Sequence, residues 1–126
     1  MDNKTQYFWV KWDKEPFLSG KVEYEKLSNK EKEILKLFLS MFFSDEAKVK
    51  CGSIRMTNVY GFKHMFERFK IPSLNIDGFY MSKYAFAYAL ELEKEFLVIK
   101  TNDDDLLVNI NSNFVKQVNI VIKNLY

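Results

Sequence analysis

The chain has 126 residues, of which 48% are hydrophobic and 17% aromatic, and its formal net charge is +2. This composition predicts a single domain over residues 1–126 with one core, and it excludes a disordered chain because so many apolar side chains can offset the entropy of ordering. Residues 1–56 carry eleven basic and nine acidic side chains and residues 57–126 carry eight of each, so the basic concentration typical of nucleic-acid binders is absent.

The first third of the chain is predicted to contain a strand, a loop and a helix. Residues 5–12 are dense in aromatic and β-branched side chains, which favours a strand. Residues 13–20 contain a proline and a glycine, which favours a loop. Ser28 and Glu31 have the spacing of a capping box, so we expect a helix from there to about Phe43. Its apolar stripe consists of Ile34, Leu35, Phe38 and Phe42, widened by Leu37 and Met41.

The middle of the chain contains a second expected helix. Residues 45–55 fit neither helix nor strand clearly, whereas residues 59–69 follow a helical period after a cap at Thr57 or Asn58. Residues 71–77 are interpreted as a connector, because Pro72 prevents the helix from continuing. One face of this helix is apolar and carries Val59, Phe62, Met65, Phe66 and Phe69. The opposite face carries Tyr60, His64 and Glu67.

The last third is predicted to alternate strands and helices. Residues 78–81 are a short expected strand, and Ser82 is the expected cap of a helix over residues 83–95. Its inner face carries Ala85, Phe86, Ala89 and Leu90 and its outer face Tyr84, Tyr88, Glu91 and Glu95.

The end of the chain is predicted to form a hairpin and then a helix. Residues 97–99 and 106–110 favour a β-hairpin with an acidic tip. Ser112 is the expected cap of a final helix, although residues 118–122 are also compatible with a strand. The inner face of that helix would carry Phe114, Val115, Val118, Ile122 and Leu125.

The order of these elements predicts an α+β fold that is rich in helix. Helix, helix, short strand, helix, hairpin and helix is roughly the order of a winged-helix module, with an N-terminal strand and a C-terminal helix added. In that arrangement residues 83–95 take the position of the recognition helix. The acidic residues Asp103, Asp104 and Asp105 take the tip of the wing.

One stretch of the sequence resembles a known group of proteins. Residues 60–67 are Tyr-Gly-Phe-Lys-His-Met-Phe-Glu, followed by Gly-Phe-Tyr-Met-Ser at 78–82 and by residues 86–90. Over about residues 60–110 this pattern is similar to small proteins of phages and mobile elements of low-GC Gram-positive bacteria, which share Tyr-Gly-Leu-Lys-His, a Tyr-containing strand and a helix with Phe and Ala-Met. Phe62 replaces that Leu, Ala89-Leu90 replaces Ala-Met, and a Trp near the final strand is missing.

The resemblance implies where the protein comes from, but it assigns a function to no residue. It implies a protein of a phage or mobile element. Small proteins of that origin often act on host machinery, including as inhibitors of defence nucleases.

The chain offers few groups for catalysis or for metal binding. His64 lies on one face with Tyr60 and Glu67 and could act as an oriented general base, but a solvated His–Glu pair is the favoured interpretation. A nucleophile–base pair of Cys51 and His64 is disfavoured, because nothing near Cys51 indicates an oxyanion hole. The three acidic residues 103–105 could bind a cation, but a charged, soluble hairpin tip is favoured. We therefore expect no enzyme, no cofactor and no metal.

The compartment is predicted from what the sequence lacks. One cysteine cannot form an internal disulfide, which suits a reducing compartment. Residues 1–4 lack the features of a signal peptide, and no apolar run reaches the length of about 18 residues that a membrane span needs. We expect the cytoplasm, that of the host cell if a phage encodes the protein.

The expected function is to bind a protein. Tyrosines four residues apart with flanking acids suit a protein partner, because tyrosine is enriched at interfaces and carboxylates repel phosphate. The predicted contacts are Tyr84, Tyr88, Glu91, Glu95, Asp103, Asp104 and Asp105. The partner would be a host protein such as a defence or nucleic-acid-processing enzyme, which the chain would inhibit or modulate.

Two further partners remain open from the sequence. A winged-helix-like DNA-binding regulator is the alternative function, and it would contact phosphate through Lys63, Arg68, Lys70 and Lys83. A second copy of the chain is the other, because the strand over residues 5–12 has two aromatic faces. One of those faces could meet another chain, or helices could cover both.

Overall fold

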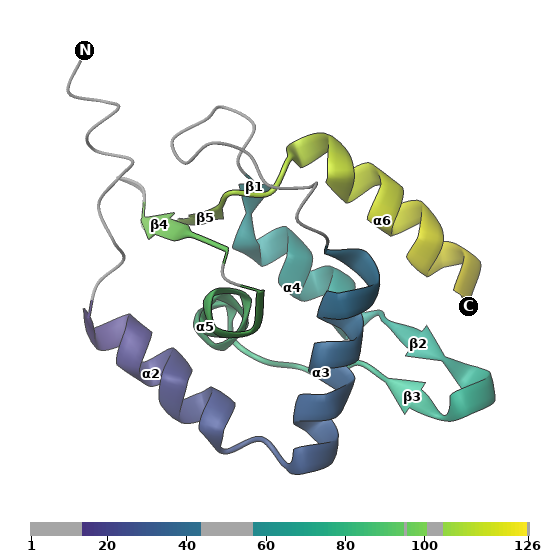
Figure 1. Cartoon of the computed structure of the whole chain (residues 1–126), viewed down its shortest axis with the longest axis horizontal. Coiled ribbons are helices and arrows are strands. Elements are labelled where there is room, and N and C mark those ends of the chain that lie inside the picture. Colours follow the sequence, from purple (N-terminus) through teal and green to yellow (C-terminus); the bar gives the residue numbers. More distant parts are fainter. Residues whose placement is uncertain (1–13, 44–56, 95, 101–104, 126) are drawn as a thin grey trace.

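Helix α5 lies at the centre of the fold, with the other helices arranged around it (Figure 1). The computed structural model describes residues 14–43, 57–94, 96–100 and 105–125, and their α+β architecture confirms the predicted class. In chain order the elements are α2 (Lys14–Glu25), α3 (Asn29–Phe42), β1 (Thr57–Asn58), α4 (Val59–Glu67), β2 (Lys70–Ile71), the 3-10 turn η2 (Pro72–Leu74), β3 (Ile76–Asp77), α5 (Lys83–Lys94), β4 (Val98–Lys100), β5 (Leu106–Val108) and α6 (Ser112–Leu125).

Helix α5 forms where the sequence predicts it and buries more than one face. The Ser82 hydroxyl accepts a hydrogen bond from the Ala85 N–H at 3.1 Å, which confirms the expected cap. The four predicted inner residues are fully buried, and Ala87 is buried as well. Small alanine side chains let neighbouring helices approach from two directions, so α5 becomes the centre of the core rather than a helix on its surface.

Helix α2 replaces the loop that was predicted for residues 13–20. Pro16 lies in the first turn of the helix, where its missing N–H has no intrahelical partner to lose. Gly20 is buried against α5: a Cβ atom there would lie 2.4 Å from the Tyr84 carbonyl oxygen. The glycine therefore permits close contact between two helices and does not interrupt one.

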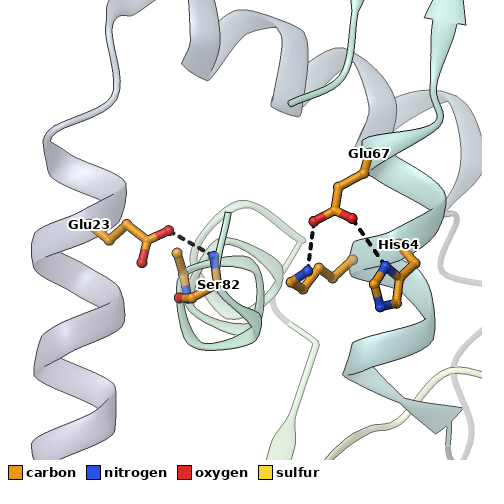
Figure 2. Close-up of polar contacts among 6 residues, drawn as sticks. Glu23, His64, Glu67 and Ser82 are labelled. Atoms are coloured by element: carbon orange, nitrogen blue, oxygen red, sulfur yellow. Dashed lines mark hydrogen bonds and ion pairs between the residues drawn. The ribbon is translucent and has the colours of Figure 1, made fainter. Parts of the chain in front are cut away.

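Aromatic and polar contacts fix α2 on α5. The Tyr88 ring packs between the rings of Phe17 and Tyr24, with centroid distances of 5.5 and 5.4 Å. The Tyr24 hydroxyl donates to Glu93 Oε2 at 2.5 Å, and burial together with this hydrogen bond raises the pKa of Tyr24 well above its ordinary value. Glu23 accepts a hydrogen bond from the Ser82 N–H at 2.8 Å (Figure 2). Helix α2 is thus an integral layer of the domain.

Helix α3 carries an aromatic core against α4 and α5. Its capping box is confirmed, since Ser28 Oγ accepts from the Glu31 N–H at 3.1 Å and Glu31 Oε1 accepts from the Ser28 N–H at 2.8 Å. Phe38 is fully buried and its ring contacts those of Phe42, Phe43, Phe66, Phe69 and Phe86. Met41 does not widen the stripe as predicted, because 45% of its surface is exposed; Leu39 is buried instead.

The three-stranded sheet has the order β1-β5-β4, and both pairings are antiparallel. Thr57 pairs with Val108, which also pairs with Val98, so the predicted hairpin of β4 and β5 is confirmed. Its tip at residues 101–104 lies outside the described part of the chain. The order α3, β1, α4, α5, β4 and β5, with β5 central in the sheet, is similar to the order expected for a winged-helix module, but α2 precedes it and β2 and β3 lie between α4 and α5.

A second, two-stranded sheet replaces the connector predicted for residues 71–77. Strands β2 and β3 pair Lys70 with Asp77 and Ile71 with Ile76. The turn between them ends at Asn75, which has a left-handed φ of 55°. The strand predicted for residues 78–81 is not formed, because the Gly78 N–H bonds to the Phe69 carbonyl at 2.7 Å and draws this segment onto the end of α4.

The C-terminal segment is helix α6, so the alternative strand over residues 118–122 is wrong. Val118 and Ile122 are buried and Phe114 is half-buried, as the helical period predicted. The expected cap at Ser112 is one residue off: Ser112 is the first helical residue, and the Asn111 side chain accepts the Asn113 N–H at 2.9 Å. None of the helices in the described segments is long and apolar enough to cross a membrane.

Candidate partner-binding surface on helix α4

The face of α5 that was predicted to meet a partner is covered by α2. Tyr84 and Tyr88 are half-buried against the core, so the expectation that they stand on an open outer face is wrong. Glu91 accepts the Val98 N–H at 3.2 Å and so joins α5 to β4. Asp105 is exposed directly before β5, whereas Glu95, Asp103 and Asp104 lie outside the described residues.

Helix α4 carries a cluster of charged groups that share one carboxylate. The Glu67 carboxylate lies 2.6 Å from Lys63 Nζ and 3.1 Å from His64 Nδ1 (Figure 2). Residues three and four positions apart meet on a helix surface, so this geometry follows from the spacing alone. The expected His64–Glu67 pair is confirmed. Lys63 is 5% exposed and already paired, which conflicts with its expected role in the DNA-binding alternative as a phosphate contact.

Two exposed tyrosines surround the buried ammonium group. Lys63 Nζ lies 4.7 Å from the ring centroid of Tyr80 and 5.4 Å from that of Tyr60, within the range of cation–π attraction. The Tyr60 ring also meets the His64 ring edge-on, with centroids 4.2 Å apart. Tyr60 and Tyr80 nevertheless keep 52% and 75% of their surface exposed. We call Tyr60, Gly61, His64 and Tyr80, supported by Lys63 and Glu67, the α4 surface.

The charges at the base of the α4 surface compensate each other. Burial of Glu67 acts to raise its pKa, but the hydrogen bonds from Lys63 and His64 outweigh it and hold the pKa of Glu67 below its ordinary value. The carboxylate is therefore ionised at neutral pH and neutralises Lys63. The Glu67 carboxylate binds Lys63 as well as His64. It therefore orients the His64 ring less strongly than a carboxylate that contacts only a catalytic histidine. This arrangement suits positioning of side chains better than proton transfer.

Gly61 is a glycine that the fold does not require. Gly20 and Gly78 both lie against backbone atoms of other segments, but a Cβ atom at Gly61 would have no atom within 4 Å beyond its chain neighbours and the backbone of its own helix. Gly61 is exposed inside α4 and has no positive φ. Glycine in a helix costs about 0.5–1 kcal/mol relative to alanine. The α4 surface therefore contains a site where another molecule could approach the helix backbone closely.

The sequence indicated part of this surface. The helical projection placed Tyr60, His64 and Glu67 together, and an exposed glycine inside a predicted helix was the available signal for Gly61. Tyr80 belongs to a different segment and could not be placed by periodicity. Within the described residues, no three His, Cys, Asp or Glu side chains gather to hold a metal ion, and Cys51 lies outside those residues.

Comparison of the chain with protein-family models, with curated proteins and with solved structures gives no match in any of the three. The α4 surface is therefore the feature from which a function of this chain can be inferred.

Proposed function

We propose that this chain is a non-enzymatic binding protein that recognises another protein through the α4 surface. The observation that carries the proposal is the pair of exposed tyrosines, Tyr60 and Tyr80, held over the buried Lys63 ammonium group. Tyrosine provides a large, rigid contact area at low entropic cost and is enriched among residues that dominate binding energy. Holding the rings in place before binding lowers that cost further.

Gly61 supports the same proposal from the backbone. It lies beside Tyr60, and the space above it is empty. Inside this domain the equivalent feature, Gly20, lets α2 approach the backbone of α5. A partner segment can approach α4 in the same manner, between the tyrosines and His64.

The finer part of the proposal rests on the resemblance to phage and mobile-element proteins. On that basis the partner is a host protein, such as a defence or nucleic-acid-processing enzyme, whose activity the chain inhibits or modulates. In this proposal, the α4 surface binds to a site on that enzyme.

Removing both tyrosine rings is expected to abolish capture of the partner. A Tyr60→Ala/Tyr80→Ala variant and the wild type are used as bait in nuclease-treated host lysate, and bound proteins are quantified by mass spectrometry. Loss of one dominant side chain costs about 2 kcal/mol or more, roughly thirtyfold in affinity. Leu92→Ala, at a side chain on α5 that is 52% exposed, is the matched control and should capture normally. Equal capture by the tyrosine variant would discard the α4 surface.

The winged-helix connectivity favours a second candidate, a DNA-binding regulator. Three observations disfavour this candidate. Tyr84 and Tyr88, on the helix in the recognition position, are partly buried, and Lys63 is buried. Lys70 Nζ lies 3.8 Å from Asp77 Oδ1, so its charge is partly neutralised. We expect no mobility shift with duplex DNA at about 50 mM salt and micromolar protein. A shift that weakens steeply with added salt would favour DNA instead, because each phosphate contact contributes a slope of about −0.9 in log affinity against log salt.

A further inference from the structure

Strand β4 is buried on both of its faces, but only one of these faces belongs to the core. Val98 and Ile99 are 3% and 4% exposed. Successive side chains of a strand point to opposite faces of the sheet. Val98 is part of the continuous core, whereas Ile99 is not. Ile99 is therefore buried on the face of the sheet that points away from the core. We call this face, which carries Ile99 and Leu107, the outer sheet face.

Leu107 extends the apolar character of the outer sheet face. It pairs with Ile99 across β4 and β5, and paired residues share one face of an antiparallel sheet. Leu107 is half-buried, whereas its neighbour Val108 is a core residue. Helices α4 and α5, which carry much of that core, both contact β5. Among the described residues, the core thus accounts for the burial of Val108 but not for that of Ile99.

We infer that residues 5–12 of this chain cover the outer sheet face. They lie outside the described part of the chain, and the sequence predicts a strand there with two aromatic faces. Burial of apolar side chains requires an apolar cover. Residues 44–56 carry five charged side chains and residues 101–104 two, which makes both stretches poor covers. Residues 5–12 carry a single charge and five large apolar or aromatic side chains, namely Tyr7, Phe8, Trp9, Val10 and Trp12.

The start of helix α2 lies within reach of this face. The Phe17 ring contacts the Tyr88 ring, with centroids 5.5 Å apart. Tyr88 lies about one helical turn before Glu91 on α5, and the Glu91 carboxylate accepts the Val98 N–H at 3.2 Å. These contacts connect the first turns of α2 to β4. An extended chain spans about 3.3 Å per residue, so residues 5–12 cover roughly 26 Å, more than the width of a three-stranded sheet.

Glu91 also determines how the segment meets β4. The Asn109 N–H donates to the Leu97 carbonyl at 3.1 Å, so the next N–H along β4, that of Val98, points away from β5. The Glu91 carboxylate already accepts this N–H. A strand added at this edge of β4 would need the same donor and would have to displace the carboxylate. Residues 5–12 therefore pack on the side chains of the outer sheet face and do not extend the sheet at this position.

Only one face of the segment meets the sheet in this arrangement. In an extended chain Tyr7 and Trp9 share one face, and Phe8, Val10 and Trp12 share the other. Each face thus carries one tryptophan, and the chain has no others. Tryptophan fluorescence therefore reports on this segment alone. We expect one indole ring to be shielded from water and the other to be exposed. The inference is independent of the α4 surface and of the function proposed for it.

The variants Trp9→Phe and Trp12→Phe leave one fluorophore each and test this arrangement in the full chain. The acrylamide quenching constant of one variant should be severalfold lower than that of the other, and its emission should be shifted to the blue. Two tryptophans that are quenched as readily as N-acetyltryptophanamide, or two that are shielded equally, would overturn the inference. Shielding that disappears on dilution would assign the cover to a second chain and overturn it as well.

Substitutions of Leu107 then show where the shielded ring lies. In the single-tryptophan variant with the shielded ring, Leu107→Lys should raise the quenching constant severalfold, and Leu107→Ala should raise it less. Leu74→Lys is the matched control, because Leu74 is a leucine in η2 that is 64% exposed, and it should leave the quenching unchanged. Circular dichroism verifies that each variant keeps its helices, and Leu107→Ala preserves the test if the lysine unfolds the chain. Shielding that survives substitution of Leu107 in a folded variant would refute the outer sheet face as the docking site.

Discussion

Gly78→Ala is expected to destabilise the fold by about 3 kcal/mol or more, above the usual range for one added methyl group. A Cβ atom at Gly78 would lie 1.8 Å from the Phe66 carbonyl oxygen and 2.9 Å from its carbonyl carbon. Both are backbone atoms of α4, so no side chain can rotate to make room. The segment would have to move away from α4, which breaks the 2.7 Å hydrogen bond from the Gly78 N–H to the Phe69 carbonyl.

Gly61→Ala is the control for this measurement and should have the opposite sign. Its new methyl group meets no atom, so alanine should stabilise α4 by about 0.5–1 kcal/mol. Urea unfolding followed by circular dichroism gives both values. Equal losses of stability in the two variants would refute the close contact at Gly78. Gly61→Ala should also bind the partner more weakly despite its greater stability, which separates a binding role from a structural one.

Local sequence signals predicted α3, α4, α5 and α6 because the causes of these helices lie within a few residues. The capping box of Ser28 and Glu31 depends only on a hydroxyl, a carboxylate and a spacing of three. The cap of α4 at Asn58, which accepts the Tyr60 N–H at 2.9 Å, is equally local. Such signals act before any tertiary contact forms, so the sequence contains all the information they need.

The errors occurred where a distant residue decides the outcome. A glycine at position 20 is typical of a loop. In the structure, however, glycine is needed there because the backbone of Tyr84, far along the chain, leaves no room for a side chain. The helical projection correctly grouped the residues on the outer face of α5. It could not show that α2 packs against this face. Tyr84 and Tyr88 became contacts within the domain for this reason. One misread helix thus changed the surroundings that were predicted for two tyrosines.

The candidate surface was half predictable for the same physical reason. Tyr60, His64 and Glu67 follow from the helical period, whereas Tyr80 comes from the connector before α5. Lys63 lies at the margin of the polar face, where a lysine ordinarily extends into water. Its burial depends on the combination of Glu67, Tyr60 and Tyr80 around the ammonium group, and this combination appears only after α4 and the connector pack together.

Substitutions of Lys63 and Glu67 should have non-additive effects on the free energy of unfolding, because the two side chains are paired. Glu67→Gln leaves a buried ammonium group without its carboxylate, and such a loss costs about 1–3 kcal/mol. Lys63→Met removes the charge and keeps an unbranched apolar chain. In the Lys63→Met/Glu67→Gln double variant no charge is left unpaired, so its loss of stability should be smaller than the sum of the two single losses, by about 1 kcal/mol or more. Additive losses in urea unfolding at pH 7 would contradict the pair.

The same pair predicts how stability responds to acid. Because the folded protein holds the pKa of Glu67 below its ordinary value of 4.5, the ionised carboxylate stabilises the fold fully above about pH 4.5. As the pH falls from there through the lower pKa of the folded state, Glu67 is protonated and that contribution is lost. Glu67→Gln has no such proton to bind, so the difference in unfolding free energy between wild type and variant should shrink below pH 4.5. A difference that stays constant down to pH 3 would mean that the pKa of Glu67 is not lowered in the folded protein.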